Sequence, residues 1–350
     1  MFFLTAISLF VIGLAYKTVI LDYKKSLVYD QDVTITIPYG ASAQTVSRQL
    51  EASNIIPNAE LFYWIHRIRV FMKLDAGFFR AGEYAFPKNR SLKLVHEKLL
   101  SGDVIFYRFT IPEGLTSREI KMLLKNDTRL VGLVPDHIEE GSLLAETYTF
   151  SKGDSRKSII LEAQKDLNII LEDLWSRRPK DFPLTSKSEV LVLASIVEKE
   201  TAIPEERPLI AAVFLNRLKK GMPLQTDPTI IYAFELETGA DFTGALTRKH
   251  LEIESPYNTY KFKGLVPSPI CHVGLSALLA VMKPEKTDAL FFVADGTGGH
   301  VFSKTYADHQ KIMKNGEKFV QNYVKKLKIK KFLQGLRLFQ RKHLVTAQPD

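Results

Sequence analysis

The sequence has a single cysteine, Cys271, among 350 residues. One thiol excludes an intrachain disulfide and leaves no plausible cysteine-based metal site. The eight histidines form no His-Glu-x-x-His motif and no comparable ligand spacing. We therefore expect neither a metal ion nor another cofactor, and we expect scattered histidines such as His272 and His300 to be structural or on the surface.

Motifs for phosphate binding and for serine catalysis are missing as well. Residues 295–299 (DGTGG) lack the Lys-Ser/Thr pair of a P-loop and the spacing of a dinucleotide-binding fingerprint. The turn of a β-hairpin, which needs positive φ angles, explains these glycines better. Ser195 is not part of a nucleophile-elbow motif. Neither segment therefore indicates a nucleotide-dependent enzyme or a hydrolase of the elbow type.

Most of the chain also lacks an excess of positive charge. The net charge is +9, but residues 311–350 hold eleven Lys/Arg against two acidic residues and account for all of it. A nucleic-acid-binding body is not indicated, and we expect no nucleic-acid partner. The basic stretch 326–350 is set apart as a C-terminal tail. It either touches an anionic lipid or polymer, or it is a solvated helix.

What the sequence does contain is an apolar N-terminus. Residues 1–16 carry no charged side chain, and the run continues to Leu21 with only Lys17 interrupting. A helix of this length spans about 30 Å, one bilayer core, so residues 1–22 are predicted to be a membrane anchor. A cleaved signal peptide is the alternative, but no basic residue precedes the run and no clear cleavage site follows. The lysines after the run would favour a cytoplasmic body.

Three segments share one strand-turn-helix pattern. They are residues 37–42 (IPYGAS), 86–91 (FPKNRS) and 111–116 (IPEGLT), each preceded by an extended run. Proline ends a strand, and the Ser or Thr four residues later caps a helix. A β-branched residue and a leucine then fall on one helix face. These pairs are Val46 and Leu50, Val95 and Leu99, and Ile120 and Leu124.

The third copy adds a capping box, Thr116-x-x-Glu119. Such units suit a small module of the LysM type at residues 31–105, although similar turns are common in α+β proteins. Other helices and strands are expected at residues 59–72, 159–177, 187–201, 204–220, 275–282, 290–294 and 300–303. The predicted fold class is therefore α+β.

Four glutamates lie in residues 196–207 (IVEKETAIPEER), directly after an apolar stretch. On a helical wheel Glu200 shares the apolar face, whereas Glu198 lies about 200° away, so the two cannot act as a close pair. A carboxyl at the end of an apolar face is partly desolvated, which raises its pKa and suits a general acid. The alternative is that both glutamates form surface salt bridges with basic residues such as Arg207 or Arg217.

Longer motifs occur in a fixed order along the chain. They are ASIVEKET (194–201), VFLNRL (213–218), LQTDPT (224–229), YNTY (257–260) and FVADG (292–296). On these motifs the sequence resembles the bacterial endolytic murein transglycosylases, the YceG-like family, over nearly its whole length. One departure is GLVP (264–267), where the family often has Gly-Leu-Pro-Pro.

The resemblance implies a lyase that cleaves peptidoglycan glycan strands between N-acetylmuramic acid and N-acetylglucosamine. The family's catalytic glutamate, the one followed by threonine, corresponds to Glu200. It would protonate the glycosidic oxygen and then act as a base on the substrate's own C6 hydroxyl, which leaves a 1,6-anhydro end. Because the nucleophile belongs to the substrate, one protein carboxylate suffices.

Further polar residues match the family's motif positions and are predicted to bind substrate. The alternative role for these residues is to stabilise helices and turns. They are Glu198, Asn216, Gln225, Asp227, Tyr257 and Asn258.

The resemblance also implies a division of the chain and a location. We expect a membrane anchor (1–22), a LysM-like module (31–105), a catalytic transglycosylase domain (106–325) and the basic tail (326–350). The body would lie on the periplasmic or extracellular side of the cytoplasmic (inner) membrane, near peptidoglycan synthases, against the charge argument. Two rivals stay open, a peptidoglycan-binding scaffold without catalysis and a hydrolase that uses Glu200 with Asp227.

Overall fold

The computed structural model describes residues 21–296 and 298–314. Apart from residues 21 and 22, the predicted anchor lies outside these ranges, and so does the predicted tail at 326–350. Of the helices within the described ranges, none has both the length and the apolar character that a membrane crossing requires. The anchor and the role of the tail stay predictions.

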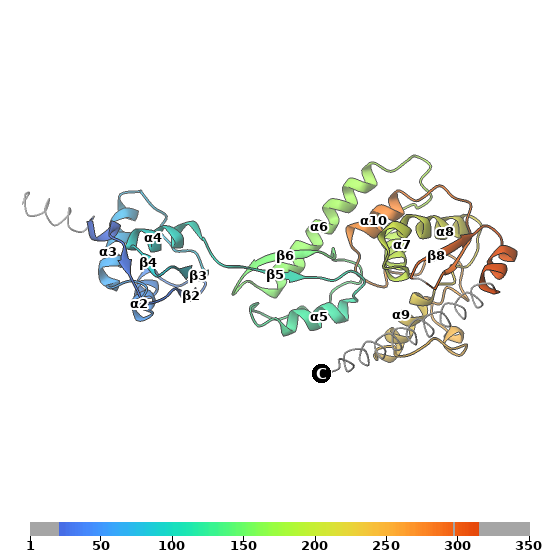
Figure 1. The fold of residues 1–350 in the computed structure, drawn as a ribbon, viewed down its shortest axis with the longest axis horizontal. Helices are drawn as coiled ribbons and strands as arrows, with labels where there is room; N and C mark the ends of the chain where they lie inside the picture. Colours follow the sequence, from blue (N-terminus) through green and yellow to red (C-terminus); the bar gives the residue numbers. More distant parts are fainter. Residues whose placement is uncertain (1–20, 297, 315–350) are drawn as a thin grey trace, which may run out of the picture. The chain divides into compact units, whose positions relative to one another are not determined.

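The chain forms two compact units, each assembled from several stretches. The first comprises the residues up to 110 together with 121–136 and 147–162, and the second comprises 111–120, 137–146 and the residues from 163 onward. Both units combine helices with antiparallel strand pairs, so the α+β prediction is confirmed (Figure 1). The predicted domain limits stay predictions.

The first unit is built around two of the three predicted strand-turn-helix segments. Strand β2 pairs with β3 and β1 pairs with β4, both antiparallel. Ser42 and Ser91 cap the two helices by accepting hydrogen bonds from backbone amides three residues later, both at 3.1 Å. The elements are β1 (Leu27–Val28), β2 (Val33–Ile37), α2 (Ala43–Ala52), α3 (Ala59–Phe71), β3 (Gly82–Phe86), β4 (Asn89–Arg90) and α4 (Leu92–Ser101).

The predicted helix faces of the repeat are buried. Val46 and Leu50 on α2, and Val95 and Leu99 on α4, are fully buried in one apolar core with residues of α3 and β3. The strand-turn-helix prediction is therefore confirmed for these two segments. The LysM-like character of the module stays a prediction.

The third segment follows the same pattern. Strand β5 (Phe106–Thr110) pairs antiparallel with β6 (Thr147–Ser151), and α5 (Ser117–Asn126) begins after the predicted turn. The capping box is confirmed, because the amide and hydroxyl of Thr116 both donate to Glu119 Oε2 at 2.8 Å. Helix α6 (Arg156–Ser176) follows β6.

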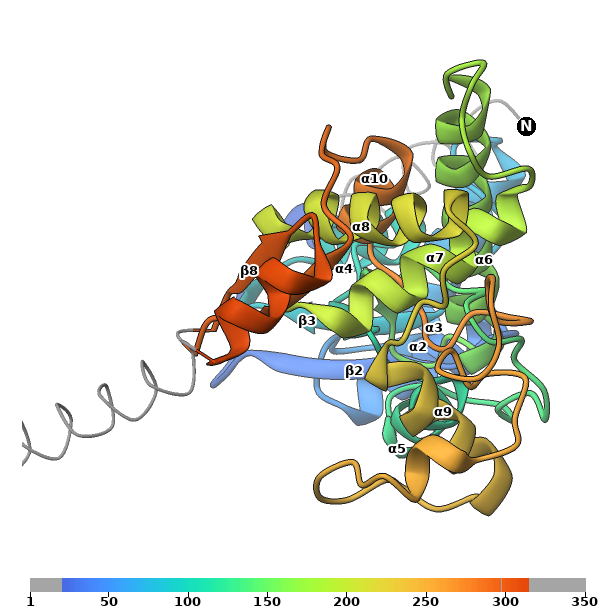
Figure 2. The same cartoon turned by 90° about the vertical axis from the view of Figure 1, so that its right-hand side faces the viewer.

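The second unit has a helical core in which α7, α8 and α10 pack against one another (Figure 2). Ser186 caps α7 by accepting from the amide of Glu189, and the following run from Val192 to Glu198 is buried. The elements are α7 (Lys187–Glu200), the 3₁₀ turn η1 (Pro204–Glu206), α8 (Arg207–Lys219), α9 (Asp227–Thr238), the 3₁₀ turn η2 (His250–Glu252), α10 (Leu275–Met282), and the hairpin of β7 (Phe291–Ala294) and β8 (His300–Ser303).

One predicted helix is divided in two. A single helix was expected from Pro204 to about Lys220, but a 3₁₀ turn covers residues 204–206 and α8 begins at Arg207. Pro208 explains the difference, because a proline cannot donate the backbone hydrogen bond that a helix starting at Pro204 would need there. Proline is tolerated in the first turn of α8, where those amide groups have no partner within the helix.

Candidate functional site

Glu200 is the last residue of α7, and its carboxylate has a buried hydroxyl as its partner. Thr226, the residue before α9, donates from Oγ1 to Glu200 Oε2 at 2.6 Å. Burial raises the pKa of Glu200, and the Thr226 hydrogen bond acts in the opposite direction. The carbonyl end of α7 also disfavours a negative charge at this position. The position predicted for a general acid therefore holds a desolvated carboxyl.

Charges of both signs act on Glu200 from three other elements. Asp227, at the start of α9, raises its pKa, whereas His300 on β8 and Arg217 near the end of α8 lower it. Asp227 is exposed and accepts a 2.5 Å hydrogen bond from the hydroxyl of Tyr260. The site therefore brings together two members of the predicted set, Glu200 and Asp227. Arg217 and His300 join them, although the sequence analysis named Arg217 only as a possible surface salt-bridge partner and expected His300 to be structural or on the surface.

Arg217 owes its position to backbone carbonyls. Its Nε donates to Leu290 O and its Nη1 to Leu224 O, each at 2.6 Å, and its guanidinium lies over the ring of Phe291. Burial lowers the pKa of Arg217. Arg217 lies in the last turn of α8, where a basic side chain suits the helix dipole. It was named from the sequence as a possible surface salt-bridge partner of the two glutamates, but the structure buries it.

His300 is held at the site by hydrogen bonds with Glu206. The two side chains lie 2.6 Å apart, and the His300 amide donates to the same carboxylate at 2.8 Å. Burial raises the pKa of Glu206, but these hydrogen bonds outweigh it and hold the pKa below its ordinary value. A proline followed by two acids at residues 204–206 is typical of a helix start, and this local pattern explains Glu206 by itself. Its partner lies 94 residues later, beyond the reach of any local pattern.

Glu198 lies away from solvent and supports the helix ends around the site. Its Oε1 lies 2.5 Å from Arg207 Nη2, and its Oε2 accepts from the amide of Gly274 at 3.0 Å. Burial raises the pKa of Glu198, while the Gly274 amide and the Arg207 guanidinium act in the opposite direction. The alternative prediction was a surface salt bridge between Glu198 and a basic residue such as Arg207. Glu198 does pair with Arg207, but the pair is buried. Its part in substrate binding stays a prediction.

A third charged residue, Glu113, completes this ion-pair network and was not predicted. Arg207 Nη2 also donates to Glu113 Oε2 at 2.9 Å. Glu113 belongs to the turn 111–116, which the sequence analysis interpreted only as a helix start. A β-carbon added to Gly274 would lie 1.9 Å from Glu113 Oε1, so any larger residue there would displace this carboxylate. The fixed spacing of the turn pattern carries no information about this distant partner.

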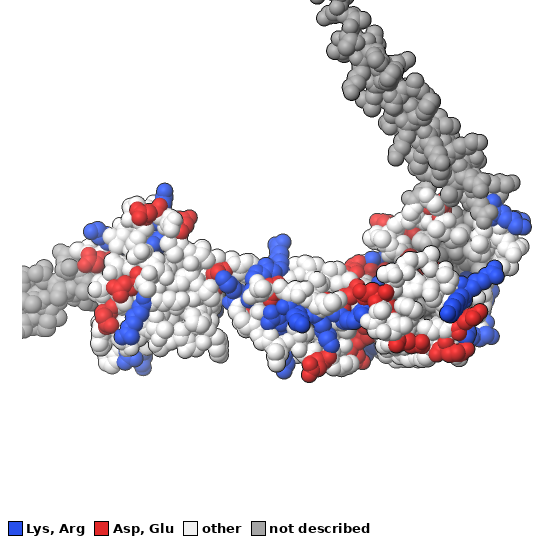
Figure 3. Space-filling view, turned by 90° about the horizontal axis from the view of Figure 1, so that it is seen from below, with Lys and Arg blue, Asp and Glu red and all other residues white. Residues whose placement is uncertain are grey.

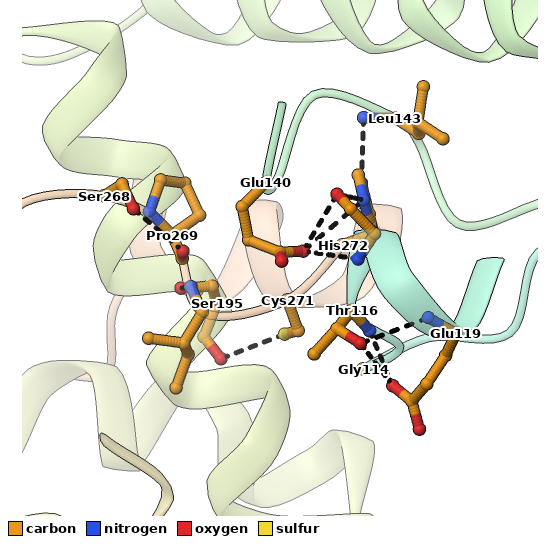
Figure 4. Close-up of polar contacts among 12 residues, drawn as sticks. Gly114, Thr116, Glu119, Glu140, Leu143, Ser195, Ser268, Pro269, Cys271 and His272 are labelled. Atoms are coloured by element: carbon orange, nitrogen blue, oxygen red, sulfur yellow. Dashed lines mark hydrogen bonds and ion pairs between the residues drawn. The ribbon is translucent and has the colours of Figure 1, made fainter. Parts of the chain in front are cut away.

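The turn that carries Glu113 is fastened by His272. The Gly114 amide donates to His272 O at 2.9 Å, and the His272 amide donates to Leu115 O at 2.8 Å. The His272 ring is fully buried, and its Nδ1 accepts from the Leu143 amide (Figure 4). Its Nε2 lies 2.9 Å from the hydroxyl of Ser117. Burial lowers the pKa of His272 to about 4, so the ring stays neutral near pH 7.

Glu140 lies beside this histidine (Figure 4). Its Oε1 accepts from the Ser117 amide at 2.9 Å and lies 3.5 Å from His272 Nε2. Burial raises the pKa of Glu140 to about 7, although the Ser117 hydrogen bonds oppose the shift. The segments 111–120 and 137–146 are thus held to residues 270–274 by a buried polar cluster. We define this cluster as Ser117, Glu140 and His272.

The other predicted polar residues differ in what their side chains contact. Asn216 donates to Thr287 O and Ala289 O, and the fully buried Asn258 donates to Leu251 O and Ile253 O. The hydroxyl of Tyr257 lies 2.6 Å from that of Ser268. These contacts favour the stabilising alternative for all three residues. Their roles in substrate binding stay predictions.

Gln225 has a different position. Its side chain is exposed, and its backbone adopts a left-handed φ of 49° between the buried residues Leu224 and Thr226. The backbone amide of Gln225 donates to Thr259 O at 3.0 Å. The strained backbone places an amide side chain one residue before the partner of Glu200.

The arrangement is suited to proton transfer by one carboxyl. In the described part of the chain, no group of three or more His, Cys, Asp or Glu side chains has the geometry to hold a metal ion. On the face shown in Figure 3, acidic and basic side chains are interspersed. A desolvated carboxyl that is influenced by both signs of charge can exist in either protonation state, as a general acid that later acts as a base requires.

Comparison with known proteins identifies close sequence relatives. Residues 35–315 match the YceG-like family. An endolytic murein transglycosylase of Bacillus subtilis is 33% identical over 311 residues, covering 80% of this chain and 83% of that protein. An endolytic murein transglycosylase of Streptococcus pneumoniae is 30% identical, covering 79% of this chain and 56% of that protein. The crystal structure of a YceG-like protein of Listeria monocytogenes is 32% identical, with a TM-score of 0.49, and covers 80% of this chain and 98% of that one.

Proposed function

This chain belongs to the YceG-like family, and we propose that it is a lyase, an endolytic peptidoglycan transglycosylase with Glu200 as its acid and base. Its substrate is the nascent glycan strand, cleaved between N-acetylmuramic acid and N-acetylglucosamine. The relatives named endolytic murein transglycosylase support this activity. The observation that carries the residue assignment is the desolvated Glu200 carboxyl and its 2.6 Å hydrogen bond from Thr226.

The reaction needs one carboxyl in two protonation states. Protonated Glu200 donates its proton to the glycosidic oxygen as the bond from the muramic acid C1 to that oxygen breaks. The carboxylate then removes the proton from the C6 hydroxyl of the same sugar, and O6 bonds to C1. The products are a strand with a free 4-hydroxyl and a strand with a 1,6-anhydro end, and Glu200 regains its proton. Water takes no part.

The surroundings of Glu200 suit both halves of this cycle. Burial and the neighbouring Asp227 raise the pKa of Glu200 and so favour its protonated form. The Thr226 hydrogen bond, His300 and Arg217 act in the opposite direction. A carboxyl with too high a pKa would give up its proton poorly, and one with an ordinary pKa would be ionised before the substrate arrived. The net effect of these influences raises the pKa of Glu200 above its ordinary value, which is the direction that a general acid needs.

We also propose a location for the reaction. The apolar run 1–21 anchors the chain in the cytoplasmic membrane, and the body lies on the periplasmic or extracellular side. There it acts beside peptidoglycan synthases and terminates the elongation of glycan strands. The support is the composition of this run together with the substrate class that the names of the relatives give.

Digestion of nascent, uncrosslinked glycan tests the activity. The full-length protein should release fragments that lack one water compared with hydrolysis products, as mass spectrometry would show. Glu200→Gln should reduce the rate at least about a hundredfold, because the amide cannot donate the proton. Glu205→Gln is the matched control, since Glu205 is exposed in the same acidic stretch and should leave the rate unchanged.

Two rivals predict other products. A hydrolase that uses Glu200 with Asp227 would release fragments with reducing ends, and the influence of Asp227 on Glu200 is the observation in its favour. A binding scaffold would retain glycan on the protein and release no fragments, with Glu200→Gln behaving like the wild type. Either result would overturn the transglycosylase assignment.

A further inference from the structure

Helix α3 in the first unit turns apolar side chains outward on the face opposite to the core. At 100° per residue, Phe62, Ile65 and His66 lie on one face and are buried. Trp64, Ile68 and Phe71 lie on the opposite face and are 57%, 50% and 87% exposed. A surface helix of a globular protein normally has its charged side chains there. The reversed pattern indicates that something other than water covers this face.

The exposed apolar surface continues past the end of the helix. Met72, Leu74 and Phe78 are all more than half exposed. Six large apolar side chains thus face outward within fifteen residues, more than scattered surface exposure explains. Arg67 and Lys73 are exposed within the same stretch. We use the name outer face of α3 for Trp64, Ile68 and Phe71 together with the exposed residues of the segment that follows the helix, Met72, Leu74 and Phe78.

Tyr23, near the start of the described residues, lies beside α3. Tyr23 is buried, and its hydroxyl lies 3.0 Å from the ring of His96. The guanidinium of Arg69, a residue of α3, lies 5.6 Å from the Tyr23 ring. Tyr23 is two residues from Leu21, where the apolar run of the sequence ends. The point at which that run ends is therefore fastened to the helix that exposes the apolar face.

We propose that the outer face of α3 binds the surface of a lipid bilayer as an interfacial helix. The inference rests on the proposed anchor, because an anchor that ends at Leu21 brings α3 to the bilayer surface. A tryptophan among aliphatic side chains, flanked by Arg and Lys, is the composition of helices that lie in the headgroup region. The two basic side chains complement anionic headgroups. The face fastens the first unit to the membrane at a second place.

The emission of Trp64 in vesicles tests this assignment. The chain has two tryptophans, and Trp175→Phe leaves Trp64 as the only one. Trp175 is half-buried against Phe182 and Arg178, so another aromatic ring suits the site. The full-length variant is reconstituted into vesicles of phosphatidylcholine and phosphatidylglycerol, with bromine atoms on the upper acyl carbons of part of the lipid. We expect the brominated lipid to quench Trp64 emission.

Two substitutions provide the matched comparison. Ile68 and Ile169 are isoleucines on helices with similar exposure, 50% and 56%. Ile68→Glu places a carboxylate in the outer face and should abolish the quenching, whereas Ile169→Glu on α6 should leave it unchanged. Because both side chains are exposed, neither substitution should unfold the chain, which circular dichroism would verify. Both substitutions are made in the Trp175→Phe protein. Equal quenching in that protein and in its two derivatives would overturn the proposal.

Other occupants of the outer face give different signals. If the residues before Leu21 cover it, Trp64 emission is shifted to shorter wavelength but unquenched at every ratio of protein to lipid. If a second copy covers it, the shift depends on that ratio and quenching is again absent. Either result overturns bilayer binding. Flotation of the protein with the vesicles tests the anchor separately, so a failed anchor is distinguished from an unbound α3.

Discussion

Arg207 Nη2 lies 2.5 Å from Glu198 Oε1, and the two side chains are only 5% and 1% exposed. The pair joins the first turn of α8 to the last turn of α7, immediately before Glu200. Arg207 Nε is buried and has no hydrogen-bond partner among the described residues, so this guanidinium depends on its two carboxylate contacts. A buried pair of this kind is costly to break, because the remaining charge has no solvent to stabilise it.

Arg207→Met should therefore lower the free energy of unfolding by about 3–5 kcal/mol, since it leaves the Glu198 carboxylate buried without its partner. Adding Glu198→Gln to this variant should restore part of the loss, because the buried charge is then absent as well. Urea denaturation of both single variants and the double variant measures the coupling. Glu113→Gln is the comparison at the same arginine. Its side chain is 44% exposed, so we expect a loss of at most about 1 kcal/mol. A loss below about 1 kcal/mol for Arg207→Met would contradict the prediction.

Thr226→Val should shift the pH dependence of the reaction. The Thr226 hydroxyl stabilises the ionised form of Glu200 and so lowers its pKa. Valine has a similar shape but no donor, so the pKa should rise further. A general acid must be protonated, and the rate therefore falls as pH rises through this pKa. We expect that descending limb to move to higher pH by about one unit.

Thr229→Val is the control for this experiment. Thr229 is buried in the first turn of α9, and its hydroxyl donates to Thr226 O rather than to Glu200. It should lower stability without moving the limb. Profiles of kcat against pH for the three proteins decide the question. An unshifted limb in Thr226→Val would mean that Glu200 is not the titrating acid.

Glu140→Gln should remove a destabilising effect of rising pH. Burial raises the folded-state pKa of Glu140 from 4.5 to about 7. Below pH 4.5 the residue is protonated in both states and carries no penalty. As pH rises toward 7 the unfolded chain releases the proton first, so the folded state loses up to about 3 kcal/mol.

The measurement is the free energy of unfolding in urea between about pH 5 and pH 8. Glutamine keeps an oxygen that accepts from the Ser117 amide, and it does not titrate. The free energy of unfolding of the variant should therefore increase relative to that of the wild type as pH rises across this range. Glu139→Gln changes the neighbouring exposed glutamate and should leave the wild-type profile intact. A constant difference between Glu140→Gln and the wild type would contradict burial as the cause.

Local patterns in the sequence predicted the elements well. The expected helix at residues 275–282 and the expected strand at 300–303 have the observed bounds, and α7 ends one residue earlier than expected. The reason is that apolar periodicity and caps act over one or two turns and can be read directly. The one divided helix, at Pro208, was also decided locally, by a proline that the helix prediction had not taken into account.

The contacts around Glu200 could not be predicted in the same way. Arg207 is 94 residues from Glu113, and Glu206 is 94 residues from His300. Glu113 and Glu206 also had sufficient local explanations, as a turn residue and as an acid near a helix start, so nothing in the pattern called for a distant partner. The wheel placed Glu200 on the apolar face, but only the fold determines that Thr226 is the residue that meets it.

Gln225→Gly should separate the backbone role of this residue from a role in substrate binding. Gln225 adopts a φ of 49°, which costs a residue with a β-carbon about 1–2 kcal/mol. Glycine relieves this strain but makes the unfolded chain more flexible, so stability should change by no more than about 1 kcal/mol. If the exposed side chain binds glycan, kcat/KM should fall about tenfold, the equivalent of one lost hydrogen bond. Asn54→Gly, at a φ of 53° in the first unit, is the control and should leave kcat/KM unchanged. Full activity in Gln225→Gly would limit Gln225 to shaping the turn that presents Thr226 to Glu200.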